Sequence, residues 1–248
     1  SSHYDMQILL EAGPQFDLNI AQQVLTALIQ RHQTLRTRYQ NQHGVAVQVI
    51  VTQPEFEIAR QVLASDVELS RARLYEVIAE QVRKPFNLSE EIPILATFVT
   101  AKEASYLMLC VHHIATDAWS MDILAQEFCT LYLAILNGNS QVLPPLTVDY
   151  VDYALWQQSG EQLQHIALQN QYWLHQLSGM SELNSLPLDY PRAKLSAHRS
   201  QTVVLDVDSE QLNRLRQIAQ NENATVFMYL HAILSLVICR YSAVNEIA

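Results

Sequence analysis

The sequence has 248 residues but only 5 glycines, 8 prolines and 3 cysteines. So few glycines and prolines exclude collagen-like chains and long flexible linkers. The cysteines lie far apart in apolar stretches, at Cys110, Cys129 and Cys239. No CxxC or Cys/His spacing indicates zinc. We therefore expect buried, reduced thiols of a cytoplasmic protein and no bound metal.

Positive charge is also scarce. Lysine and arginine number 15 against 25 acidic residues, a formal net charge of −10, which is a poor match to nucleic acid or to an anionic membrane surface. The longest apolar stretch, Val226 to Ile238, is interrupted by polar side chains and is too short to span a bilayer. The first residues lack the pattern of a secretory signal. Hydrophobic residues still make up 49% of the chain, enough for a sizeable core, which excludes disorder over most of its length.

Hydrophobic periodicity alternates between strand and helix spacing along the chain. Strands are predicted at 4–10, 34–39, 45–51, 94–101, 106–111 and 202–207, and helices at about 17–31, 66–84, 120–136, 148–158, 162–177, after 209, and at 226–241. Asp17 and Ser209 are the expected helix N-caps, and His43-Gly44 the expected hairpin turn. The last helix is apolar on most faces, so we expect it to be buried. This order predicts an α/β fold, a mixed sheet with flanking helices.

The composition changes between Ser178 and Ser200, where prolines, serines and basic residues follow no clear period. We interpret this stretch as a crossover between two lobes. The predicted domains are a first lobe over 1–178 and the crossover with the beginning of an incomplete second lobe over 179–248.

The candidate chemistry lies between the strand at 106–111 and the following helix. His112, His113 and Asp117 follow one another there, and such junctions often carry active-site groups. Adjacent strand residues point to opposite faces, so both histidines are not expected to bind one zinc ion. An imidazole can take or share a proton, and an aspartate can orient a partner or pair with an arginine. The alternative is a histidine that merely packs in the core. No GxSxG nucleophile motif is present, and Cys110 has no charged neighbour to activate it.

Five segments in order and spacing resemble the condensation domains of nonribosomal peptide synthetases. Residues 112–118, HHIATDA, resemble the family's HHxxxDG signature. Residues 31–39, RHQTLRTRY, are similar to its RHExLRTxF segment, and residues 149–157, DYVDYALWQ, to its YxDYAxWQ segment. Residues 84–88 and 186–192 are similar to its PFDL and LPxDxPRP stretches.

This resemblance implies a chloramphenicol-acetyltransferase-like lobe, one half of a V-shaped pair with a tunnel between the lobes. Family domains are longer than this sequence, so we expect a truncated two-lobe architecture with exposed apolar surface on the last helix. The implied partners are donor and acceptor carrier proteins and an adjacent adenylation domain, with no nucleic acid and no membrane. Phosphopantetheine arms present the substrates, and the domain itself binds no cofactor. The acceptor's α-amine attacks the donor thioester and forms an amide.

The resemblance also assigns roles to residues. His113 is the expected catalytic residue, either as a base or by positioning the amine and managing charge in the tetrahedral intermediate. His112 is expected to be structural, and Asp117 to hold the loop through Arg36 or Arg38. The expected roles of a further aromatic and acidic set are packing and polar anchoring: Trp119, Tyr150, Asp152, Tyr153 and Trp156.

Two positions depart from the family pattern. Ala118 replaces a glycine, which is costly only if the backbone there needs a positive φ. Gln33 replaces a glutamate. The alternatives to amide formation are an ester-forming acyltransferase of the same superfamily and an impaired docking domain, although the latter would normally lose His113 or Asp117. Cyclising domains have aspartates in place of both histidines and are excluded. The Trp119-Ser120 order disfavours epimerisation.

Overall fold

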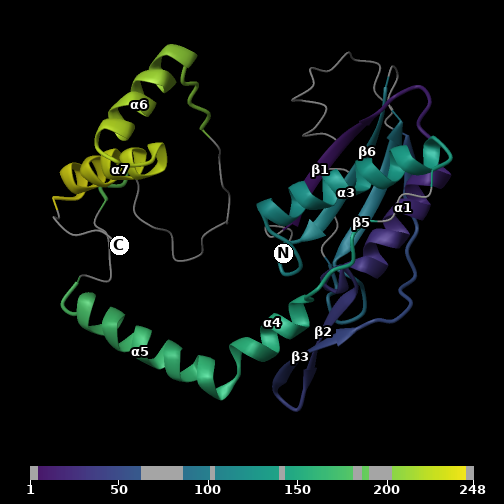
Figure 1. Cartoon of the computed structure of the whole chain (residues 1–248), viewed down its shortest axis with the longest axis horizontal. Helices are drawn as coiled ribbons and strands as arrows, with labels where there is room; N and C mark the ends of the chain where they lie inside the picture. Colours follow the sequence, from purple (N-terminus) through teal and green to yellow (C-terminus); the bar gives the residue numbers. More distant parts are fainter. Residues whose placement is uncertain are drawn as a thin grey trace. The chain divides into compact units, whose positions relative to one another are not determined.

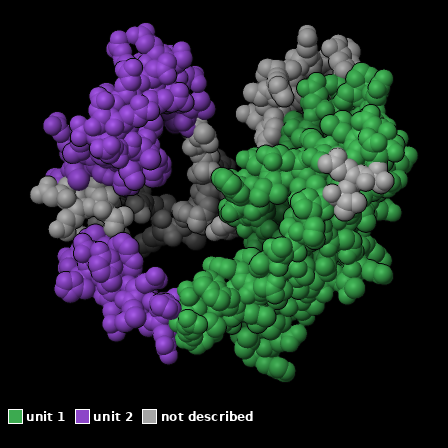
Figure 2. Space-filling view, in the orientation of Figure 1, with its two compact units in different colours: residues 1–163 green, residues 164–248 purple. Residues whose placement is uncertain are grey.

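The computed structural model describes residues 5–62, 86–100, 104–139, 143–180, 186–189 and 203–243. The chain forms two compact units, Ser1–Leu163 and Gln164–Ala248 (Figure 2). The helix predicted at 66–84 lies outside the described residues, as do parts of the family-like segments at 84–88 and 186–192. The predicted lobe boundary between residues 178 and 179 stays a prediction.

A mixed four-stranded sheet forms the centre of the first unit, in the order β1-β6-β5-β4. Strands β1 (Asp5–Ala12) and β5 (Ile94–Thr100) run antiparallel to β6 (Ser105–His112), and β4 (Ala59–Val62) runs parallel to β5. The mixed sheet confirms the predicted fold class. The sequence did not predict β4, because its four residues, ARQV, carry no strand periodicity.

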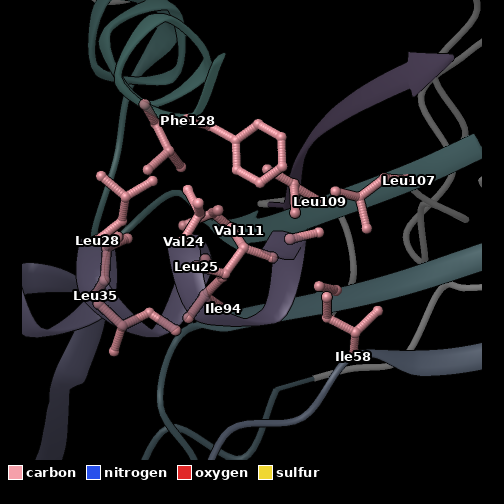
Figure 3. Close-up of a cluster of buried hydrophobic side chains, with 14 of the residues drawn as sticks. Val24, Leu25, Leu28, Leu35, Ile58, Ile94, Leu107, Leu109, Val111 and Phe128 are labelled. Atoms are coloured by element: carbon pink, nitrogen blue, oxygen red, sulfur yellow. The ribbon is translucent and has the colours of Figure 1, made fainter. Parts of the chain in front are cut away.

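Helices α1 (Leu18–Arg31) and α3 (Ala118–Leu136) pack against the sheet and enclose the core (Figures 1 and 3). Alternate residues of β6 enter this core and meet apolar side chains of α1 and α3: Leu107, Leu109 and Val111 against Val24, Leu25, Leu28, Met121, Leu124 and Phe128. The predicted cap of α1 is confirmed, since the Asp17 carboxylate accepts hydrogen bonds from the Asn19 and Ile20 amides. The core therefore fixes both elements that flank the histidine segment.

A separate hairpin, β2 (Thr37–Gln42) and β3 (Val45–Ile50), follows α1. Its turn is His43-Gly44, as predicted, and both residues have positive φ, 54° and 86°. That geometry suits the right-handed twist of the paired strands. The strand predicted to begin at residue 34 begins only at Thr37, because Gln33–Arg36 forms a 3₁₀ turn, η2, in which the Leu35 amide donates to the His32 carbonyl.

Helices α4 (Tyr150–Gln157) and α5 (Gly160–Gln176) follow, and α5 continues into the second unit. The described part of that unit also contains α6 (Ser209–Asn221) and α7 (Val226–Ser242). Asp208 caps α6 through the Gln211 amide, so Ser209, the expected cap, is instead the first helical residue. Residues 203–207 form no strand, since no described strand lies beside them to pair with.

The predicted burial of the last helix is wrong in the described structure. Phe227 is 75% exposed and Leu236 is 65% exposed, so the other expectation for this helix, an exposed apolar surface, agrees with the described structure. Two of the three cysteines also contradict the expected burial: Cys110 is buried, but Cys129 is exposed on α3 and Cys239 is half-buried on α7.

No single helix in the described ranges is long and apolar enough to cross a membrane, and only α6 with α7, bent by 96°, passes that test as a pair.

Candidate active site

The histidine segment leaves the sheet at the end of β6. His112 is the last strand residue, paired with Asp5 in register, and its amide donates to the Pro93 carbonyl at 2.9 Å. The Ala115 amide then donates to the His112 carbonyl at 2.9 Å and closes a turn. Because the strand ends there, His113 lies in the turn and its side chain is exposed.

A cavity of about 450 Å³ opens beside this turn, within the first unit. Four segments contribute to its wall: the residues after α1, the turn itself, the first two turns of α3, and the start of α4. The lining residues are His32, Thr34, Leu35, His113, Ile114, Ala115, Thr116, Asp117, Ser120, Ile123, Leu124 and Tyr150.

His113 lies in this wall, and no residue in the described ranges hydrogen-bonds its ring. Both ring nitrogens can therefore bond to a molecule in the cavity. An imidazole in the neutral form offers one donor and one acceptor, which suits it to accept a proton or hydrogen bond from an amine.

His112 is held differently and does not line the cavity. Its Nδ1 accepts a hydrogen bond from the Ile114 amide at 3.0 Å, and its ring meets the edge of Phe86 with centroids 5.9 Å apart. Burial lowers the pKa of His112; the Asp5 carboxylate opposes this effect, and the neighbouring His113 adds to it. Nδ1 can accept the hydrogen bond from the Ile114 amide only when it carries no proton. A lowered pKa of His112 therefore favours the form of the ring that stabilises this turn.

Asp117 caps the N-terminus of α3. Its Oδ1 accepts from the Ser120 amide at 2.8 Å and from the Ser120 hydroxyl at 2.5 Å, and these bonds lower the pKa of the carboxyl group. The predicted pairing with an arginine is absent among the described residues: Arg36 donates to the Gln30 and Val51 carbonyls, and Nε of Arg38 is buried without a partner in the described ranges. The reason is local, because a carboxylate at an N-cap is already satisfied by amides three residues on.

Ala118 is the first residue of α3 and is exposed. It is not among the residues with positive φ, so its methyl group costs no backbone strain. Trp119, the next residue, is 79% exposed and is not part of the cavity wall.

An ion cluster that sequence reasoning missed holds α1 to α3 next to the cavity. Glu127 of α3 accepts from Arg31 Nε at 3.2 Å, and its second oxygen lies 2.6 Å from His32 Nε2. His32 also lines the cavity. No pattern in the sequence links Glu127 to Arg31 or His32, which lie far away in the chain. Helical periodicity indicates only that Glu127 lies on the same face of its helix as Ile123 and Leu124, one turn earlier.

The start of α4 completes the wall. The Asp149 amide donates to Asp152 Oδ2 at 2.9 Å, and Gln33 Nε2 donates to Asp149 Oδ2 at 2.8 Å. Tyr150 lines the cavity, while its ring also contacts Tyr153, which in turn contacts Trp156, with centroids 5.8 and 5.7 Å apart. The structure thus brings Tyr150 to the cavity and leaves Tyr153 and Trp156 as an aromatic row outside its wall.

Tyr39 of β2 connects this region to the turn. Its hydroxyl donates to the Ile114 carbonyl at 3.5 Å, and its pKa is raised first by burial and then by Tyr150. In the described ranges no three histidine, cysteine or acidic side chains come together as metal ligands would.

Comparison with known proteins agrees with the motif resemblance. The family model described as "Condensation domain" matches residues 1–248. Enniatin synthase of Fusarium equiseti is 33% identical over 237 residues, which are 94% of this chain and 7% of that protein. Bacitracin synthase 2 of Bacillus licheniformis is 30% identical over 246 residues, 98% of this chain and 9% of that protein. The chain therefore spans a small part of the curated relatives that it matches.

Solved structures agree on the fold. The X-domain in its complex with OxyB from teicoplanin biosynthesis matches with a TM-score of 0.80 at 25% identity, over 97% of this chain and 52% of that one. The epimerization domain from the third module of tyrocidine synthetase B matches with a TM-score of 0.79 at 23% identity, over 98% and 56%. This chain thus spans about half of each of those domains.

Proposed function

This chain belongs to the condensation-domain family, and from that premise we propose that it joins a donor acyl or peptidyl thioester to the α-amine of an acceptor aminoacyl thioester. The amine nitrogen attacks the thioester carbonyl, so that a C–N bond forms and the C–S bond breaks. The amine loses a proton and the thiol leaving group gains one.

The observation that carries this proposal is His113, exposed in the cavity wall without a hydrogen bond to any described residue. An α-amine has a pKa of about 8, so a fraction is unprotonated near neutral pH. His113 needs only to accept a hydrogen bond from this amine, which positions it and carries the proton that the tetrahedral intermediate releases.

Neighbouring residues support His113 without joining the chemistry. His112 fixes the turn through the Ile114 amide, and Asp117 fixes the start of α3 through Ser120. Asp117 carries its charge near His113, and that proximity is itself part of the lowered pKa of Asp117.

The proposed partners are a donor and an acceptor carrier protein, each with its phosphopantetheine arm, and an adjacent adenylation domain in a cytoplasmic synthetase. The domain itself would bind no cofactor. The names of the enniatin and bacitracin relatives fit such a setting, since each is a synthase.

The test uses the complete protein that contains this sequence, with donor and acceptor carrier proteins loaded as aminoacyl thioesters. Intact-mass spectrometry follows the appearance of the dipeptidyl carrier. We expect His113→Ala to lower the rate at least about a hundredfold, the size of a lost acid–base or positioning group. His165→Ala on α5, an exposed histidine outside the cavity, is the matched control and should retain the rate.

An unchanged rate for His113→Ala would contradict the proposal. If the wild-type protein leaves both thioesters intact, the same assay is repeated with free alcohols as acceptors. Ester formation there would replace the amide-forming reaction with the acyltransferase alternative.

A further inference from the structure

Helix α4 is held to the first unit by a side-chain amide. Gln33 Nε2 donates to Asp149 Oδ2 at 2.8 Å across 116 positions of sequence. A carboxylate only accepts hydrogen bonds, so the NH₂ end of Gln33 faces Asp149. The other end, Oε1, is buried without a hydrogen-bond partner in the described ranges.

This bond matters because, among the described residues, few other contacts hold α4. None of its residues is buried, so core packing does not fix its position. Its own cap, the bond from the Asp149 amide to Asp152, is internal to the helix. Among the described side chains, Gln33 provides the hydrogen bond that connects this cap to another element of the unit.

Tyr150 follows Asp149 directly and lines the same cavity as His113. It lies close enough to Tyr39 to raise the pKa of that hydroxyl, and Tyr39 donates to the Ile114 carbonyl next to His113. The position of Asp149 therefore determines the position of Tyr150 in the cavity wall.

We propose that Gln33 is a positioning residue: through Asp149 it sets the start of α4, and with it the Tyr150 wall that shapes the cavity for the acyl group or amine. This inference rests on the proposed function for its kinetic consequence, but its structural part stands on the Gln33–Asp149 bond alone. Gln33 suits the role because a neutral amide can donate to a carboxylate at any pH near neutrality.

A carboxylate in place of this amide would behave differently. In Gln33→Glu two carboxylates face each other, and one of them would take up a proton because like charges at this distance disfavour double ionisation. The pKa of that protonated carboxyl group is raised. The hydrogen bond between the introduced glutamate and Asp149 therefore forms at low pH and is lost as the pH rises through this pKa. At neutral pH we therefore expect α4 to be released.

The test reverses which side chain, at position 33 or at position 149, donates the hydrogen bond. Gln33→Glu breaks the bond, and Gln33→Glu combined with Asp149→Asn restores it in reverse. In the double variant the introduced asparagine donates its amide to the introduced glutamate, while asparagine remains a good N-cap. Gln23→Glu, on an exposed position of α1 without a described hydrogen bond, adds the same charge elsewhere. The readouts on the complete protein are hydrogen exchange of residues 149–157 and KM and kcat for the loaded carrier proteins.

For Gln33→Glu at pH about 7.5 we expect exchange at 149–157 and KM to rise roughly tenfold, with kcat within about twofold. The double variant should return both to within about threefold. Unchanged exchange in α1 and α3 shows that the unit is still folded. Wild-type behaviour of Gln33→Glu, no recovery in the double variant, or altered exchange without a change in KM would each overturn the inference. If the wild-type protein forms no amide, the exchange data still decide the structural part separately from the proposed function.

Discussion

The Glu127 cluster makes a quantitative prediction about what binds α1 to α3. In Glu127→Ala, Arg31 and His32 lose their common acceptor. A hydrogen bond to a charged group contributes about 1.5–3 kcal/mol. The two bonds share one carboxylate and are not additive. Their side chains are 17%, 22% and 15% exposed for Arg31, His32 and Glu127, so water replaces part of what is lost. We therefore expect a loss of about 2 kcal/mol.

A contrast within the same chain tests the reasoning. Glu210 and Arg214 form a shorter contact, 2.8 Å against 3.2 Å for Arg31 and Glu127, but their side chains are 77% and 74% exposed. Exposed pairs four residues apart on a helix contribute about 0.3–0.5 kcal/mol. Glu127 has two partners, one of them 2.6 Å away, and a side chain that is only 15% exposed, so Glu210→Ala should have a several-fold smaller effect than Glu127→Ala.

Thermal unfolding followed by circular dichroism measures both. For a domain of this size about 1 kcal/mol lowers Tm by about 2–4 °C, so Glu127→Ala should lower the Tm of its unit by about 4–8 °C. Glu127→Gln keeps an acceptor without the charge and should lie between the two. Equal shifts for Glu127→Ala and Glu210→Ala, or a shift below about 1 °C for the former, would refute the argument.

Two further predictions concern the histidine segment. Burial lowers the pKa of His112, so the folded protein binds fewer protons there than the unfolded chain. This contribution to stability is complete above the unfolded pKa of about 6.5 and is lost as pH falls through the lower folded value. His112→Asn, which keeps an acceptor for the Ile114 amide, should flatten the dependence of the urea midpoint on pH between about 5 and 7; an unchanged slope would contradict the assignment. Ala118→Gly should leave the condensation rate within about twofold and cost less than about 1 kcal/mol of stability, because Ala118 has an ordinary helical backbone. A clear gain in rate would show that the methyl group obstructs the site.

The sequence predicted the elements around the site because their signals are local. The apolar alternation of β6 and the helical spacing of α3 bracket the histidines, and Asp117 lies at the junction between them. The predicted pairing of Asp117 with Arg36 or Arg38 was wrong, and the sequence itself shows why. Ser120 stands three residues after Asp117, the spacing at which a capped amide lies, and this local bond competes successfully with an arginine far away in the chain.

Other errors arise where a short pattern fits two structures. The residues before Thr37 alternate in the manner of a strand, but they are too few to pair, and the Leu35 amide bonds back to His32 instead. Cys129 lies in an apolar run of α3, but a helix that packs on the core with one side still has an outer face. The bonds of Gln33 to Asp149 and of His32 to Glu127 could not be predicted, because polar residues carry no periodicity that joins positions 116 and 95 apart.

The division of work between the two histidines follows from where β6 ends. The last residue of a strand is held by its neighbours, and His112 is accordingly fixed by the register with Asp5, the Ile114 amide and the Phe86 ring. The next residue has left the sheet, and its ring has no hydrogen-bond partner among the described residues at the cavity wall. Neither role needs a special backbone at residue 118, since the turn is closed by the Ala115 amide and the helix is started by Asp117. The position of the His113 imidazole is thus determined by the end of β6 and by these two hydrogen bonds, and Ala118, which has no positive φ, is compatible with that geometry.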